Sequence, residues 1–226
     1  GMPGDTGLKA WEILYVNDGS SDASLEVIAR IQNEDPAVSL LSFSRNFGKE
    51  QAISAGLQHA RGDAVVVIDA DLQDPPELIA DIVRAWREGA DVVNMRRLSR
   101  DGETWFKRAT AHAFYRVMER LSEVPIPADV GDFRLLSRRA VDALNLLPER
   151  NRFMKGLFAW IGYRQVTLDY HRHARAAGQS KWPYWRLWNF ALEGITGFST
   201  LPLKLASYIG VLAAVAATLY APINLV

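Results

Sequence analysis

Two aspartates one residue apart, Asp69 and Asp71, follow directly after a valine-rich run in this chain. The run, Val65–Ile68, has the β-branched composition of a buried strand. Two carboxylates where a strand ends repel each other unless a cation lies between them. A hard divalent cation favours oxygen ligands and also binds phosphate oxygens. We therefore predict that this pair holds a divalent metal.

A structural alternative explains a neighbouring carboxylate but not the pair. Asp74 precedes two prolines and a glutamate, which is typical of a helix N-terminus. We assign Asp74 to the helix cap and keep Asp69 and Asp71 as candidate metal ligands.

A second acidic turn, Asn17–Ser20, follows an earlier strand-like segment. Gly19 permits a tight turn that leaves Asp18 facing the edge of the sheet. Asp22 or Ser21 is expected to cap the helix that follows. Such turns are common, so this one gains weight only in combination with the later acidic pair.

Strand-like and helix-like segments alternate around these turns. Short buried strands are predicted over Glu12–Val16, Val38–Phe43, Ala64–Ile68 and Asp91–Asn94. Apolar residues have helical spacing in Ala23–Asn33, Lys49–Ala60 and Glu77–Glu88. The alternation predicts an α/β fold with a mostly parallel sheet flanked by helices. Ligands of such sheets bind beyond the carboxyl ends of the strands, where the acidic pair should lie.

The composition limits the classes of function. The chain has 226 residues, of which 49% are hydrophobic and 23% charged, so it can bury a core. Its net charge of +0 argues against nucleic acid as a partner. The absence of cysteine excludes disulfides and thiolate metal sites.

A basic segment, 171–182, lacks helical and strand periodicity and is predicted to be a loop that closes over bound substrate. Its donors for a phosphate monoester are Arg172, Arg175, Ser180 and Lys181. The alternatives are a solvated surface loop and attraction to anionic lipid. His171 and His173 have no third metal ligand in view and are expected to face solvent.

The C-terminal region has the features of a membrane-associated segment. Aromatic residues alternate with Arg186 and Asn189 in the predicted interfacial helices, 183–204, although a packed interdomain helix would show the same pattern. Residues 205–226 carry no charge, which predicts a transmembrane helix. The alternative is a buried C-terminal helix, which fits the many alanines of this segment, Pro222 and Asn224.

Five motifs, in this order, resemble those of the family 2 glycosyltransferases of GT-A fold. The motifs are Asn17–Ser20, Ser44–Ala52, Asp69–Pro76, Gly131–Leu135 and Ala177–Lys181. The chain is most similar to the polyprenyl-phosphate glycosyltransferases, the group that includes dolichyl-phosphate mannose synthase and bacterial undecaprenyl-phosphate enzymes. The resemblance runs from about Trp11 to Leu205. It implies a UDP- or GDP-sugar donor, a polyprenyl-phosphate acceptor, a divalent metal and inverting transfer of a single sugar.

The resemblance also implies roles for individual residues. Asp18 would contact the nucleoside, while Asp69, Asp71 and Gln73 would hold Mg2+ or Mn2+ against the donor diphosphate. The metal would neutralise the charge that builds on the departing nucleoside diphosphate. Lys49 either begins a helix after a turn or contacts the nucleotide.

Asp132 and Asp71 are the candidate catalytic residues. Asp132 lies far along the chain from the acidic pair, so we expect it on another side of the sugar, where it orients the donor. A phosphate oxygen is already a competent nucleophile, so a strong general base is unnecessary. Arg134 would share a strand face with Asp132 and bind the acceptor phosphate. The alternative for this pair is a buried salt bridge with a neighbouring element.

The resemblance divides the chain into a catalytic domain, an acceptor loop, interfacial helices and a transmembrane helix, over residues 1–170, 171–182, 183–204 and 205–226. Members of the family begin with a strand that ends in a turn, and this turn binds the nucleobase. Only Gly1–Ala10 precedes Trp11 here, so we expect that strand to be missing. The relatives' second membrane span is also expected to be lacking here. The expected location is the cytoplasmic membrane, with the catalytic domain facing the cytoplasm and in contact with membrane lipid. Whether the chain forms a homo-oligomer stays open.

Two other functions stay open. A processive polysaccharide synthase shares the early acidic motifs but should carry a Gln-x-x-Arg-Trp motif, which Arg150–Phe153 does not match. A non-catalytic membrane scaffold would need no acidic pair at the end of a strand.

Overall fold

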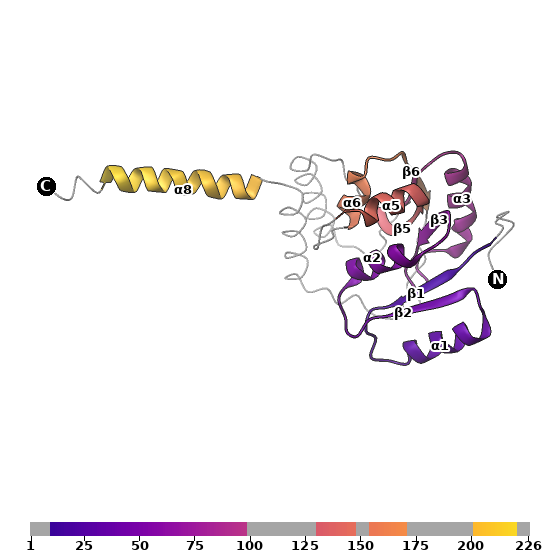
Figure 1. The fold of residues 1–226 in the computed structure, drawn as a ribbon. Coiled ribbons are helices and arrows are strands. Elements are labelled where there is room, and N and C mark those ends of the chain that lie inside the picture. Colours follow the sequence, from indigo (N-terminus) through magenta and orange to yellow (C-terminus); the bar gives the residue numbers. More distant parts are fainter. Residues whose placement is uncertain (1–9, 99–129, 148–153, 171–200, 221–226) are drawn as a thin grey trace. The chain divides into compact units, whose positions relative to one another are not determined.

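The computed structural model describes residues 10–98, 130–147, 154–170 and 201–220 of the chain (Figure 1). The chain divides into two units. The first comprises residues 1–104 and 127–181, and the second comprises residues 105–126 and 182–226. The described part of the second unit is helix α8, Leu201–Tyr220.

The first unit begins with two strand–helix pairs. They are β1 (Ile13–Asn17), α1 (Ser24–Glu34), β2 (Val38–Ser42) and α2 (Lys49–His59). Strands β1 and β2 are parallel, with Ile13 opposite Val38 and Asn17 opposite Ser42. Their carboxyl ends therefore lie side by side, and the turn after each strand starts at the same edge. The predicted elements are confirmed here to within one or two residues.

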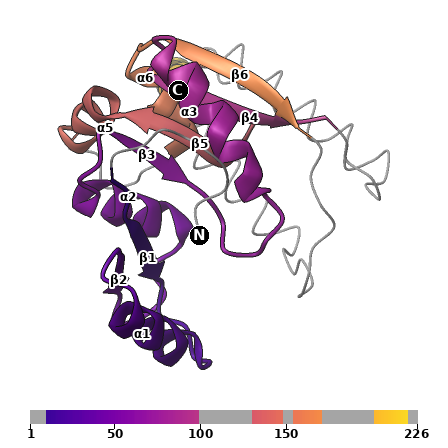
Figure 2. The same ribbon diagram turned by 90° about the vertical axis from the view of Figure 1, so that its right-hand side faces the viewer.

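The larger sheet has the strand order β3-β5-β4-β6. Its strands are β3 (Ala64–Val67), β4 (Val92–Arg97), β5 (Val130–Ser137) and β6 (Gln165–Tyr170). Strand β5 is antiparallel to both β3 and β4, whereas β4 and β6 are parallel (Figure 2). The sheet is therefore mixed, because β5 enters it from the edge at which β3, β4 and β6 end.

Helices cover both faces of this sheet. A 3-10 turn, η1 (Pro76–Leu78), continues into α3 (Ile79–Arg87), which packs against β4 and β5 (Figure 2). Helix α5 (Arg138–Asn145) packs against β3 and β5. Helix α6 (Met154–Trp160) contributes further buried side chains. Six of the eight residues of β5 are buried, on both of its faces, and they include polar Arg134 and Ser137.

The main core lies between α3 and the sheet. Its buried members are Ile82, Val83, Ala90, Val93, Met95, Phe133, Leu135 and Tyr170. Alternation along β5 points Phe133 and Leu135 into this core and directs Asp132 and Arg134 to the other face.

Neither capping prediction is confirmed. The N-cap of α1 is Ala23, and no side chain caps the helix, so the assignment of Asp22 or Ser21 as its cap is wrong. The carboxylate of Asp22 lies one residue earlier and accepts a hydrogen bond from the Ser24 backbone N–H at 3.0 Å. The assignment of Asp74 as a helix cap is wrong, because the residue before η1 is Pro75 and no side chain caps that turn. Prolines at 75 and 76 have no N–H to offer a cap, and Asp74 is instead buried and accepts a hydrogen bond from the Tyr170 hydroxyl.

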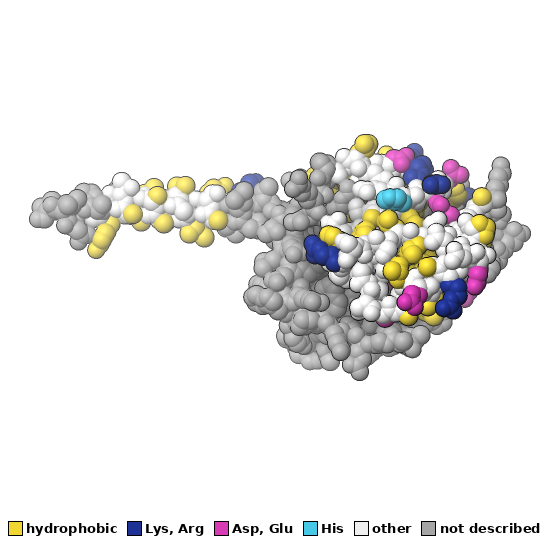
Figure 3. Space-filling model, turned by 60° about the horizontal axis from the view of Figure 1, so that its bottom comes forward, with side chains coloured by type: hydrophobic (Ala, Val, Ile, Leu, Met, Phe, Trp, Pro, Cys, Tyr) yellow, Lys and Arg dark blue, Asp and Glu magenta, His cyan; other side chains and the backbone are white. Residues whose placement is uncertain are grey.

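Helix α8 has exposed apolar side chains along its length (Figure 3). They include Tyr208, Ile209, Val211, Leu212, Val215 and Tyr220. No helix among the described residues combines the length and the apolar character that a membrane span requires.

Candidate functional site

The turn after β1 is shaped by the side chain of Asn17. This residue is 5% exposed, and its Nδ2 donates a hydrogen bond to Ser42 Oγ at 3.0 Å. Its Oδ1 accepts a hydrogen bond from the Ser20 backbone N–H at 3.1 Å. One side chain therefore ties the end of β1 to the end of β2 and also closes its own turn.

Asp18 connects this turn to the one that follows β2. Its two carboxylate oxygens accept hydrogen bonds from the backbone N–H groups of Phe47, at 2.7 Å, and Gly48, at 2.9 Å. The Asn46 side chain donates to the Asp18 carbonyl oxygen at 3.2 Å. Asp18 thus holds the residues that lead into α2. Its nucleoside contact stays a prediction.

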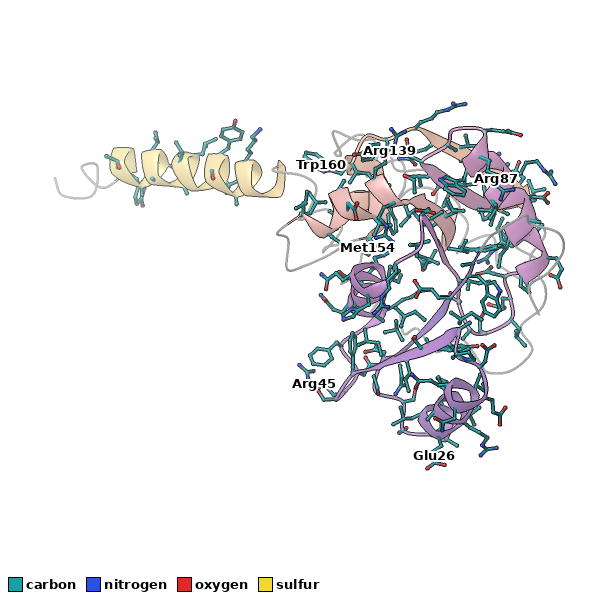
Figure 4. All side chains as sticks on the ribbon, turned by 45° about the vertical axis from the view of Figure 1, so that its right-hand side comes forward. Glu26, Arg45, Arg87, Arg139, Met154 and Trp160 are labelled. Carbon is teal, nitrogen blue, oxygen red and sulfur yellow. The ribbon has the colours of Figure 1, made fainter. Side chains whose placement is uncertain are left out.

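The two turns approach so closely that only glycine fits at position 19. Gly19 has φ +65°, in the left-handed region. A Cβ built there would lie 2.5 Å from the Asn46 backbone nitrogen and closer still to the Arg45 carbonyl carbon. Arg45, labelled in Figure 4, belongs to the turn after β2. The backbones of the two turns therefore pack directly against each other.

Three of the predicted site residues meet at one point. Lys49 Nζ lies 2.7 Å from Asp69 Oδ2 and also 2.7 Å from Asp132 Oδ2. The side chains of Lys49, Asp69 and Asp132 are 47%, 32% and 17% exposed, so solvent reaches this charged group.

The strand register explains why Asp69 and Asp132 converge. Val67 at the end of β3 lies opposite Arg134 in the antiparallel pair with β5. Asp69 is two residues beyond Val67, and Asp132 is two residues before Arg134, so the same register brings them together. The expectation that Asp132 lies on another side of the sugar stays a prediction.

The ammonium group of Lys49 stays charged in this setting. Burial lowers the pKa of Lys49, but the carboxylates of Asp132 and Asp69 raise it by more, so that it lies above its ordinary value of 10.5. At neutral pH the contact is a positive charge between two negative ones.

The loop after β3 has an unusual backbone at Leu72. Asp71 Oδ1 accepts a hydrogen bond from the Gln73 backbone N–H at 3.1 Å. Leu72, between them, has φ 58° and is 69% exposed. Within the described ranges, no group of three or more His, Asp or Glu side chains is arranged to hold a metal ion. The metal role of Asp69, Asp71 and Gln73 stays a prediction.

Arg134 is a core residue in this structure. It is 2% exposed, its guanidinium lies 3.9 Å from the centre of the Phe158 ring, and its Nη2 donates to the Gly131 carbonyl oxygen at 2.6 Å. Burial lowers the pKa of Arg134 to about 10, although the negative charges of Asp132 and Glu50 act to raise it. The role of Arg134 in binding the acceptor phosphate stays a prediction.

Sequence comparison places the chain in a known family. Residues 6–144, more than half of the chain, match the profile of glycosyl transferase family 2. The chain belongs to this family. An uncharacterized glycosyltransferase of Synechocystis is 53% identical over 211 residues, which cover 93% of this chain and 66% of the relative. The bactoprenol glucosyl transferase of Shigella phage SfV is 50% identical over 209 residues, which cover 92% of this chain and 68% of the relative. The chain thus spans about two thirds of the length of these relatives.

Two solved structures share the fold of this family 2 glycosyltransferase. The mannosyltransferase PcManGT of Pyrobaculum calidifontis, in complex with GDP-Man and Mn2+, has a TM-score of 0.50 at 19% identity, covering 91% of this chain and 66% of the other. Glucosyl-3-phosphoglycerate synthase of Mycobacterium tuberculosis, in complex with Mn2+, UDP-glucose and phosphoglyceric acid, has a TM-score of 0.50 at 22% identity. The match covers 80% of this chain and 65% of the other. At these identities the likeness shows a GT-A-like α/β fold.

Sequence reasoning missed two contacts made by acidic residues of the motifs. Glu50 Oε2 accepts a hydrogen bond from the backbone N–H of Met154, the first residue of α6 (Figure 4). The hydroxyl of Tyr170, the last residue of β6, donates to Asp74 Oδ1, and both residues are 5% exposed. The acidic side chains were visible in the motifs, but their partners lie far away in the sequence and no local pattern identifies them.

The predicted acceptor loop, 171–182, lies outside the described residues. Its candidate ligands, Arg172, Arg175, Ser180 and Lys181, lie outside the described residues, as do His171 and His173. Of the predicted interfacial helices, 183–204, only the first turn of α8 is described.

Proposed function

We propose that this family 2 glycosyltransferase transfers one sugar from a nucleotide-sugar donor to polyprenyl phosphate, with inversion at the anomeric carbon. The observation that carries the proposal is the meeting of Lys49, Asp69 and Asp132 at the edge where β3 ends. In open α/β sheets, ligands such as a nucleotide-sugar donor bind at the edge where the parallel strands end. The choice of acceptor is supported by the name of the phage relative, since bactoprenol is a polyprenol.

The acidic loop has a donor set that fits a divalent cation. Asp69 and Asp71 offer carboxylate oxygens, which Mg2+ and Mn2+ prefer, and Asp69 is partly exposed. We propose that these two residues, with Gln73, hold the metal. When bound, the metal would act as a Lewis acid that stabilises the charge on the nucleoside diphosphate.

The remaining residues would bind and orient the two substrates. Asp132, whose side chain is 17% exposed, would orient the donor sugar. Its contact with Lys49, which also contacts Asp69, supports this role. Asp18 would contact the nucleoside at the turn that it shares with the start of α2. The basic loop, 171–182, would hold the acceptor phosphate through charge-assisted hydrogen bonds.

A lipid acceptor requires the enzyme to work at a membrane surface. We propose that residues 183–226 attach the protein to the cytoplasmic membrane, with the catalytic unit on the cytoplasmic side. The support is the series of exposed apolar side chains on α8 and the aromatic residues that precede it in the sequence. Vesicle flotation with and without residues 183–226 would test this attachment.

The reaction can be tested with purified protein in detergent. The protein is given Mn2+, undecaprenyl phosphate and, in separate reactions, radiolabelled UDP-glucose or GDP-mannose. We expect a lipid-extractable, acid-labile product with one sugar, inverted anomeric configuration and release of the nucleoside diphosphate. A product that lengthens with time would indicate a processive synthase instead, and transfer to a soluble acceptor in preference to the lipid would refute the acceptor assignment.

Asp71→Asn is the matched variant for this assay. It should abolish transfer and leave the melting temperature almost unchanged, because it removes a charge from a loop rather than volume from the core. Normal transfer by this variant in the presence of a chelator would refute the metal role.

A further inference from the structure

The position of Lys49 is unfavourable for the helix that carries it. Lys49 is the first residue of α2, where the helix has a partial positive charge and disfavours a cation. Glu50, the next residue, has the charge that this end of a helix prefers. The contacts that compensate for the position of Lys49 are the two at 2.7 Å with Asp69 and Asp132.

The same side chain has room to move. Lys49 is the most exposed of the three, at 47%, and its long aliphatic chain begins at the end of a helix. Its ammonium group can therefore leave Asp69 without opening the core. The carboxylates are less exposed, at 32% and 17%, so they form the more fixed side of the contact.

We propose that Lys49 is an internal counter-ion that occupies Asp69 until the metal and the donor bind, and is then displaced from it. This inference rests on the proposed function, in which Asp69 is a metal ligand. A divalent cation on Asp69 and an ammonium group at 2.7 Å from the same carboxylate would repel each other. The diphosphate of the donor is the anion to which the displaced ammonium would turn.

The consequence is a coupling between metal and nucleotide. The metal alone must compete with Lys49, so it binds weakly, whereas the nucleotide gives the displaced ammonium a new partner. Metal and nucleoside diphosphate therefore favour each other's binding, and the coupling is the same in both directions. Before the donor arrives, Lys49 also keeps Asp69 and Asp132 from repelling each other.

The test measures Mn2+ binding to the full chain by the loss of the free Mn2+ signal in electron paramagnetic resonance. Lys49→Met keeps the length of the side chain and removes its charge. We expect Mn2+ alone to bind this variant roughly tenfold more tightly, because a charge-assisted hydrogen bond no longer has to be broken. The increase in Mn2+ affinity caused by UDP or GDP should be smaller in the variant by a similar factor.

Two controls separate this competition from a general effect of charge. Lys49→Arg keeps the charge, so Mn2+ alone should bind it about as weakly as it binds the wild type. Arg84→Met removes a positive charge from an exposed ion pair with Asp81 on α3 and should leave Mn2+ affinity unchanged. Without metal, Lys49→Met should melt at a lower temperature than the wild type. Mn2+ should raise the melting temperature of the variant and so remove this difference. Lys49→Gln serves for the same measurement if the methionine variant does not fold.

The failures of the two proposals are distinguishable. If Lys49→Met binds Mn2+ more weakly than the wild type or equally well, Lys49 only positions Asp69, and the counter-ion role is refuted even when sugar transfer occurs. If the wild type binds no Mn2+ with either nucleotide, the metal-dependent reaction itself is refuted.

Discussion

Replacing Gly19 with alanine should be among the most damaging small changes in the first unit. An L-residue in the left-handed region costs about 1–2 kcal/mol. The new Cβ would also lie 2.5 Å from the Asn46 nitrogen, a distance that real Cβ atoms do not adopt, so one of the two turns must move.

The second cost comes from the hydrogen bonds that hold the turns together. Moving the turn after β2 breaks the bonds from Phe47 and Gly48 to the Asp18 carboxylate. Bonds to charged groups contribute about 1.5–3 kcal/mol each, and partly exposed ones lie near the lower end. With the backbone cost, the total loss is about 4–5 kcal/mol. For a domain of this size, that corresponds to a melting temperature lower by about 10 °C or more.

Gly162→Ala is the matched control. Gly162 has φ +69°, close to that of Gly19, but a Cβ at this position would have the Trp160 carbonyl oxygen as its nearest neighbour, at 3.9 Å, which is an ordinary contact. This variant should lose only the backbone cost of about 1–2 kcal/mol. Urea unfolding of both variants measures the difference. Equal losses would show that the close approach of the two turns does not constrain the fold, and would refute the reasoning.

Two further predictions concern buried carboxylates. Tyr170→Phe should lower the free energy of unfolding by about 1–3 kcal/mol, because buried Asp74 loses a hydroxyl donor; urea unfolding beside Tyr163→Phe checks this, and equal losses would contradict it. The hydrogen bond from Arg139 holds the pKa of Asp91 below its ordinary value of 3.8. This carboxylate therefore stabilises the fold above about pH 4, and its contribution is lost as the pH falls through the lowered pKa of the folded state. Asp91→Asn should therefore lower stability at pH 7 and flatten the loss of stability below about pH 4, which unfolding curves at pH 7 and pH 3 would show; an unchanged pH dependence would count against the role of Asp91.

The early elements of the fold and both acidic turns could be predicted from sequence because their signals are local. Strands such as Val38–Ser42 and helices such as Lys49–His59 are determined by side-chain periodicity within a few residues. A tight turn with glycine at position 19 also has a local signature. The motifs that carry the family resemblance lie on these same turns, so the family could be recognised before any geometry was known.

Which of these residues meet depends on the pairing of segments that are distant in the sequence. The antiparallel entry of β5 between β3 and β4 depends on pairing between distant segments, such as Val67 with Arg134, and no local pattern encodes it. That register brings Asp132 beside Asp69, and packing buries Arg134 against Phe158. The chemistry at the ends of the strands could be predicted from the sequence, because residue type and local periodicity suffice for that. Only the fold determined that one lysine at the start of α2 joins two of those carboxylates, because such a contact depends on the three-dimensional arrangement of three separate elements.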